Sequence, residues 1–131
     1  MKEIIIVAGR DKVDVCWVRH CLKEHGYNSL PCKSVEQILE ELEVLPTCGA
    51  QVPLVIIEPR ILSDIDRELI DKLSDCCLDV PILPLGNEID ACDEPGDVYE
   101  QLCEHRTRFT RRQNPELADI LERAGVAVVK T

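Results

Sequence analysis

A single carboxylate, Glu58, ends the short apolar run 53–57. Such a run is typical of a buried strand, and in open α/β sheets ligands and chemistry collect at the carboxyl ends of the strands. The first apolar run of the chain, 3–8, ends in three residues of different character: Gly9, Arg10 and Asp11. The sequence therefore predicts an edge site in which the carboxylate of Glu58 lies near the positively charged side chain of Arg10.

Cysteine and histidine residues gather in the segment that we expect to form the first helix. Cys16 with His20, and Cys21 with His25, are four residues apart, the spacing that lets two side chains on a helix meet one metal ion. The two pairs point in different directions around the helix, so one ion does not easily collect all four. We favour core cysteines and amphipathic histidines, and keep a thiol- or metal-responsive protein as the alternative.

The charge of the chain argues against a general nucleic-acid binder, because the formal net charge is −10 and aromatic residues make up 3% of the chain. A basic run near the C-terminus leaves a grip on nucleic acid or on an acidic partner open, although a solvated helix face is the simpler interpretation. Its arginines are Arg106, Arg108, Arg111 and Arg112. The chain has no dinucleotide-binding, P-loop or G-x-S-x-G motif, so we expect no cofactor.

The N-terminal apolar run is too short for a signal sequence or a membrane span. We therefore expect a cytoplasmic protein without a membrane segment, in which the eight cysteines are reduced thiols. No Cys-x-x-Cys spacing occurs, so the common zinc and iron–sulfur arrangements are missing.

Apolar runs alternate with amphipathic segments, and alternating strands and helices indicate parallel βαβ units. The expected strands are 3–8, 27–32, 53–57 and 79–86, with a closing strand at 126–129. The expected helices begin at Asp14, Ser34, Ser63, Asp97 and Asn114. We expect residues 1–131 to form one domain, with a three-layer α/β/α fold around a doubly wound parallel sheet.

Some details of this pattern are specific. The inward stripe of the first helix is expected to contain Val15, Val18, Cys21, Leu22 and His25, with Trp17 alongside. Ser34 and Gln37 have the spacing of a capping box. The strand 27–32 is expected near a sheet edge, because Pro31 cannot donate to a ladder of hydrogen bonds.

Several short matches suggest a known family. They are Gly26-Tyr27 at the end of the first helix, the run from Ser34 to Leu39, Glu68-Leu69-Ile70, the run from Val80 to Gly86, and the run from Ala124 to Thr131. In this order they resemble the receiver domains of bacterial response regulators, which have a CheY-like, flavodoxin-like fold. The resemblance covers residues 3–86 and weakens over 87–131, where the spacing before the last strand is roughly twice that of the family and nothing remains for a fifth helix.

The resemblance implies a changed active site. Glu58 stands where the family has its phospho-accepting aspartate, and the end of the first strand has Gly9, Arg10 and Asp11 where the family has acidic residues that bind magnesium. Gly86 stands where the family has a switch Thr or Ser, and Lys130 matches the lysine that pairs with the phosphate. Autophosphorylation needs a divalent cation held by several oxygen ligands, so we expect no phosphorylation.

Arg10, joined by Lys130, is expected to pair with Glu58 instead. A surface pair contributes only about 0–1 kcal/mol, so this one would shape a site more than stabilise the fold. An exposed Glu58 with no role is the plain alternative.

Our leading hypothesis is a degenerate receiver-like module of a bacterial cytoplasm that acts through protein–protein contacts, as a homodimer, and is not an enzyme. The alternatives are the thiol- or metal-responsive protein described above, and an enzyme site built from Arg10, Glu58 and Lys130, for which the sequence offers no nucleophile.

Overall fold

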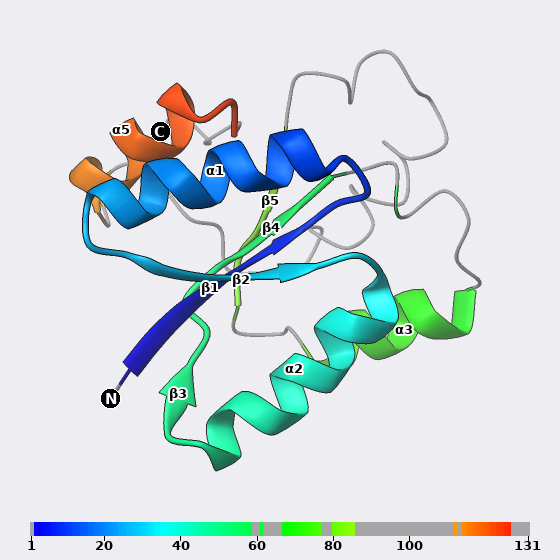
Figure 1. Ribbon diagram of the computed structural model, residues 1–131. Helices are drawn as coiled ribbons and strands as arrows, with labels where there is room; N and C mark the ends of the chain where they lie inside the picture. The colour runs from blue at the N-terminus through cyan, green and yellow to red at the C-terminus, as the bar shows by residue number, and fades with distance from the viewer. Residues whose placement is uncertain are drawn as a thin grey trace.

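The computed structural model of the protein describes residues 2–58, 61, 67–76, 80–85, 112 and 114–126 (Figure 1). Several predicted features lie outside these residues: Gly86, Lys130, the start of the helix expected at Ser63, the helix expected from Asp97, and the basic run apart from Arg112. Arg112 is exposed.

The sheet has the predicted parallel architecture. Its main strands are β1 (Lys2–Ala8), β2 (Asn28–Cys32), β4 (Val55–Ile57) and β5 (Ile82–Pro84), hydrogen-bonded in the order β2-β1-β4-β5. All three contacts between neighbours are parallel, and Ile6 of β1 lies opposite both Leu30 of β2 and Val55 of β4. The strand with Pro31 therefore lies at the end of this order, as predicted.

One short strand was not predicted. β3 (Ala50–Gln51) pairs in parallel with the start of β1, at Lys2 and Glu3. Two residues are too few to show the alternation by which a strand is recognised in a sequence.

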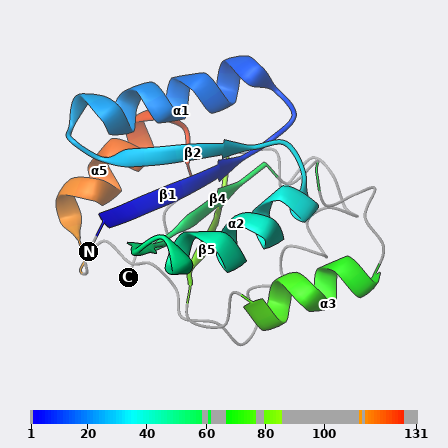
Figure 2. The same cartoon turned by 60° about the horizontal axis from the view of Figure 1, so that its bottom comes forward.

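The side chains of β1 alternate between two cores, one on each face of the sheet. Ile5 and Val7 pack into one core with residues of α1 (Lys12–Glu24) and α5 (Pro115–Arg123). Ile6 and Ala8 pack into the other core, which α2 (Val35–Thr47) and α3 (Arg67–Cys76) cover. Figures 1 and 2 show this three-layer arrangement, with one pair of helices on each side of the strands. The predicted α/β/α fold class is confirmed.

Side-chain caps define where the helices begin. Ser34 Oγ accepts a hydrogen bond from the backbone N–H of Gln37 (3.3 Å), and Asn114 Oδ1 accepts one from the N–H of Leu117 (3.1 Å), as the sequence predicted. The Gln37 side chain accepts from the N–H of Lys33, so the expected capping box reaches one residue further back than its pattern implies.

The first helix differs from its prediction in two ways. It begins at Lys12 rather than Asp14, because Asp11 has an extended conformation and caps it. His25 follows the last helical residue and is exposed, so it does not belong to the inward stripe. Trp17, which we expected alongside the stripe, is 53% exposed. The rest of that stripe is buried as predicted.

The end of the chain joins the sheet differently from the other strands. Gly125 adopts a positive φ of 91°, which suits glycine, and ends α5 where the sequence predicted a stop. Val126 then forms an isolated antiparallel bridge with Leu85. The closing strand expected at 126–129 is thus described only at Val126, and there it is antiparallel to its neighbour. Within the described residues, no helix has the length and apolar character that crossing a bilayer requires.

Candidate functional site at the carboxyl edge of the sheet

Glu58 directly follows β4, at the edge where β1 and β5 also end. Its backbone N–H donates to the carbonyl oxygen of Ala8 (2.8 Å), and its own carbonyl accepts from the N–H of Ile61 (3.1 Å). The residue is only 6% exposed. Among the described residues, it is the only charged residue that is buried. Its Oε2 atom is buried and has no hydrogen-bond partner among the described residues. The interpretation of Glu58 as an exposed glutamate is therefore wrong.

Gly9 makes room for this carboxyl group. A Cβ atom at position 9 would lie 3.0 Å from Oε2 of Glu58, 3.2 Å from Cβ of Glu58 and 3.1 Å from Cγ2 of Val15. The backbone of Gly9 is also fixed, because its N–H donates to the carbonyl oxygen of Cys32 (3.0 Å). The side chain of Glu58 thus lies where a side chain at position 9 would need space, and we refer to these two residues as the Gly9–Glu58 pair.

Asp11 serves as the N-cap of α1. Its Oδ1 atom accepts hydrogen bonds from the backbone N–H groups of Val13 (2.9 Å) and Asp14 (3.3 Å). An N-cap side chain satisfies amide groups that the helix itself leaves unpaired. The acidic residue that follows the first strand is therefore held at the start of the helix.

We expect Asp11→Ala to lower the free energy of unfolding by about 1 kcal/mol, because the amides of the first turn lose their acceptor. Asp11→Asn should change it little, since asparagine caps about as well as aspartate. Chemical denaturation of the two variants checks this. If the asparagine variant were as unstable as the alanine variant, the charge of Asp11 rather than its cap would be what matters.

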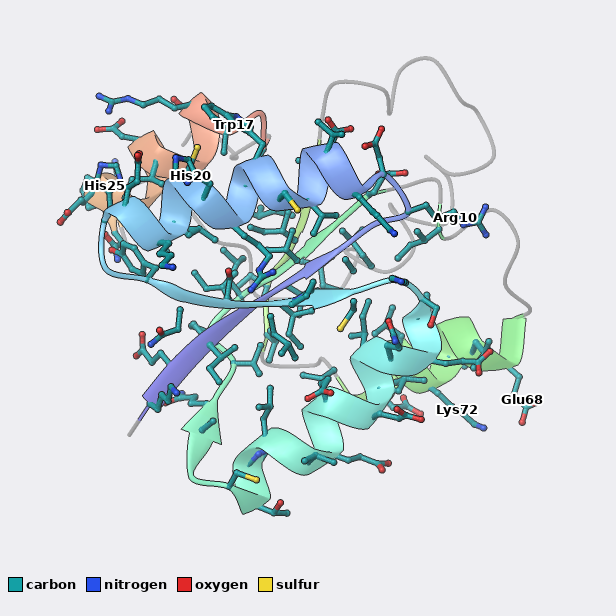
Figure 3. All side chains as sticks on the ribbon, viewed as in Figure 1. Arg10, Trp17, His20, His25, Glu68 and Lys72 are labelled. Carbon is teal, nitrogen blue, oxygen red and sulfur yellow. The ribbon has the colours of Figure 1, made fainter. Side chains whose placement is uncertain are left out.

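Arg10 is exposed, and Figure 3 shows its side chain extending outward from the end of β1. The ion pair that we expected between Arg10 and Glu58 does not satisfy Oε2 of Glu58, because that atom has no partner among the described residues. At this oxygen, therefore, the carboxylate of Glu58 and the guanidinium of Arg10 do not pair.

The described residues of this edge offer few oxygen ligands for a divalent cation. Mg²⁺ requires near-octahedral coordination by oxygens. Gly9 offers no side chain, Asp11 caps a helix, and Glu58 is packed against Gly9. In the described part of the chain, no group of three or more His, Cys, Asp or Glu side chains is arranged to hold a metal ion.

The two cysteines and two histidines of the first helix do not converge on one point. Cys21 is buried in the core, whereas Cys16 and His20 are exposed on the other side of α1. His20 pairs with Glu24 (Nε2 to Oε1, 3.1 Å), and Nδ1 of His25 lies 3.0 Å from the carbonyl oxygen of Cys21. These four residues are not brought together as one metal site.

The buried thiols are poorly suited to redox sensing. Burial, with a smaller effect of the nearby Glu41 charge, raises the pKa of Cys32 from 9.0 to about 11. Burial and the Glu24 charge also raise the pKa of Cys21. Because the thiolate is the reactive form of cysteine, both thiols are expected to react slowly at neutral pH.

The raised pKa of Cys32 predicts a pH dependence of stability. The unfolded chain loses this proton near pH 9 and the folded chain only near pH 11, so the contribution is complete below pH 9 and is lost as the pH rises to about 11. Denaturation midpoints between pH 8 and 11 should therefore fall more steeply for the wild type than for Cys32→Ala, which has no group to titrate there. Equal slopes for the wild type and Cys32→Ala would contradict the raised pKa of Cys32.

No protein-family model matches the chain, and no curated protein matches its sequence significantly. Among solved structures, a response regulator receiver protein from Pseudomonas putida is similar with a TM-score of 0.57 and 13% identity, over 94% of this chain and 98% of that one. A fusion protein that carries the yeast Spc42 trimeric coiled coil is similar with a TM-score of 0.56 and 19% identity, over 94% of this chain and 77% of that one.

The chain therefore has the fold of a response-regulator receiver domain, as its sequence pattern predicted. At the edge where strands of this fold end, it presents a buried glutamate packed against a glycine. Sequence reasoning identified the position of Glu58 and missed its contact with Gly9. One signal for this contact was present in the sequence. A residue without a side chain, Gly9, follows one strand, and a residue with a long acidic side chain, Glu58, follows the neighbouring strand.

Proposed function

We propose that this protein is a degenerate receiver, a regulatory module that acts through protein–protein contacts and takes up no phosphoryl group. The receiver fold supports the signalling part of the proposal. The buried Gly9–Glu58 pair is the observation that carries the rest, because a phosphoryl acceptor must be reached by its donor and the Glu58 side chain is 6% exposed.

The scarcity of cation ligands among the described residues of the edge supports the same proposal. Phosphoryl transfer relies on a metal ion to neutralise the charge of the transferred group. In this chain Asp11 is engaged as a helix cap, and the residues at positions 9 and 10 carry no carboxylate. By the resemblance, Gly86 and Lys130 belong to the same edge, and their place there is part of the proposal. We further propose that the module works in a bacterial cytoplasm, as a homodimer, and without catalytic activity of its own.

Acetyl phosphate with Mg²⁺ tests this proposal, because it phosphorylates a working receiver without a kinase. Intact-protein mass spectrometry of the wild type should show no added phosphoryl group, and sedimentation should show an unchanged oligomeric state. A receiver domain with a complete acidic cluster serves as the positive control, and Glu58→Gln serves as the matched variant. An acid-labile phosphoryl adduct that forms on the wild type and is absent from Glu58→Gln would overturn the proposal.

A further inference from the structure

The outer face of α1 carries an apolar patch. Val13 is 77% exposed and Trp17 is 53% exposed, and both belong to the few large hydrophobic residues that the described chain leaves in solvent. They line a shallow hollow together with Lys12, Cys16 and His20. Residues three or four apart share one helix face, so these side chains and Glu24 form a continuous band. We call the band the α1 stripe: Lys12, Val13, Cys16, Trp17, His20 and Glu24.

The two aromatic rings of the stripe lie next to each other. The rings of Trp17 and His20 lie 6.0 Å apart between centroids, tilted by 31°, and His20 Nε2 lies 3.1 Å from Oε1 of Glu24. Figure 3 shows both labelled rings on the side of α1 that faces away from the sheet. Because preorganised aromatic side chains lose little conformational entropy on binding, and Trp is enriched in interface hot spots, the stripe is suited to a protein contact.

Charge points to a second copy of this chain as the occupant. Among the helices whose bounds the structure gives, α1 carries a net charge of +1, while α2 carries −4, α3 −1 and α5 −2. Of these four helices α1 is the only one with a positive net charge, so in a chain with a net charge of −10 it is the one that an acidic second copy repels least. The outer face of α2 offers a poorer surface for Trp17, because its exposed Val44 is flanked by carboxylates that burial would desolvate.

The α1 stripe is also complementary to itself. Lys12 lies at one end of the stripe and Glu24 at the other, about 18 Å apart along the helix at a rise of about 1.5 Å per residue. If two such helices pack antiparallel about a two-fold axis, each Lys12 meets the partner's Glu24, and the two Trp17 rings lie near the axis. A two-fold axis makes the same patch serve both copies, as in most homodimers.

We propose that α1 is the self-association surface of this protein, and that two copies pair antiparallel along their α1 stripes. This inference rests on the homodimer in the proposed function and adds the surface and its symmetry. The contact needs no residue of the sheet edge and is separate from Glu58.

Sedimentation equilibrium of single variants gives the first test. Trp17→Ser should raise the dimer dissociation constant at least about tenfold, because a central aromatic anchor is lost. Val44→Ser removes a comparably exposed apolar side chain from α2 and should leave the constant unchanged. Both positions are exposed, so thermal unfolding should confirm that the variants remain folded. The chain has one tryptophan, and its emission should shift to shorter wavelength as wild-type dimers form.

Charge reversal gives the sharper test. Lys12→Glu and Glu24→Lys should each weaken self-association, because each homodimer then brings like charges together at both ends of the stripe. An equimolar mixture of the two variants should dimerise again, since in the mixed dimer every pair of facing charges is opposite. Within one chain the two positions are too far apart to compensate each other.

The outcomes separate this inference from the proposed function. The α1 pairing would be overturned if the wild type dimerised and neither Trp17→Ser nor the charge-reversal variants changed the dimer dissociation constant. The homodimer of the proposed function would then still stand. Assembly beyond the dimer would overturn the two-fold symmetry and the inference with it. A wild type that stays monomeric at high concentration would overturn the homodimer itself, whatever the result with acetyl phosphate.

Discussion

Gly9→Ala should lower the free energy of unfolding by about 1–3 kcal/mol, the usual cost of inserting a methyl group into a packed site. The added Cβ would lie 3.0 Å from Oε2 and 3.2 Å from Cβ of Glu58, and 3.1 Å from Cγ2 of Val15. Neither neighbour can withdraw easily, because Val15 belongs to the core and Glu58 is bound through its backbone on both sides. Chemical denaturation measures the change.

A double-mutant cycle assigns this loss to the Gly9–Glu58 pair. Combining Gly9→Ala with Glu58→Ala removes the closest contact, so the two substitutions should be non-additive, with a coupling of about 0.5–3 kcal/mol. Gly125→Ala is the matched control: it is strained by its φ of 91°, but a Cβ there meets no atom within 4 Å. It should also destabilise the protein and should show no coupling with Glu58→Ala. Additivity of the Gly9 and Glu58 substitutions would mean that the contact does not exist.

Glu58→Met should raise the free energy of unfolding by about 1–3 kcal/mol, because an unpaired buried polar group costs about that much. Methionine has nearly the same shape, so it fills the space without leaving a cavity. The buried Oε2 atom has no partner among the described residues, which is the physical reason for the gain.

Glu40→Met is the control for this prediction. Glu40 is exposed on α2, and its replacement should change stability by no more than about 0.5 kcal/mol. If Glu58→Met instead lost stability, a cation such as Lys130 would have to pair with the carboxyl group in the folded protein. A cycle with Lys130→Met would then identify it.

Much of the fold follows from the sequence because burial on both faces of a sheet leaves a clear pattern. The continuous apolar run of β1 supplies both cores, and the shorter apolar strand β4 beside it also contributes to both. The caps at Ser34 and Asn114 were predicted because a cap needs only one residue type at one local position.

The site was harder to predict because its defining contacts join residues far apart in the chain. That Glu58 is buried depends on the space that Gly9 leaves, and no local pattern records such a contact. Asp11 and Asp14 are both acceptable N-caps by type, and only the backbone conformation selects Asp11. Trp17 lies beside the inward stripe of α1, where a rotation of the helix by a fraction of a turn decides between core and surface.

If the protein is a degenerate receiver, as we propose, the residues at this edge explain how the fold can persist without phosphoryl transfer. The parallel strands bring Gly9 and Glu58 to the same edge, as they do for any residues at those positions. There, glycine and glutamate pack against each other, whereas carboxylates at the same positions would repel one another unless a cation held them together. We therefore expect that the fold does not depend on a bound cation at this edge.

Binding of Mn²⁺, followed by nuclear magnetic resonance of the ¹⁵N-labelled protein, tests this claim most directly. Mn²⁺ substitutes for Mg²⁺ at oxygen sites and broadens the amide signals around it. We predict that the amides of Gly9, Arg10 and Glu58 keep their intensity, and that any broadening is weak and spread over exposed acidic residues such as those of α2. Selective and saturable broadening centred on Gly9 and Glu58 would contradict the account.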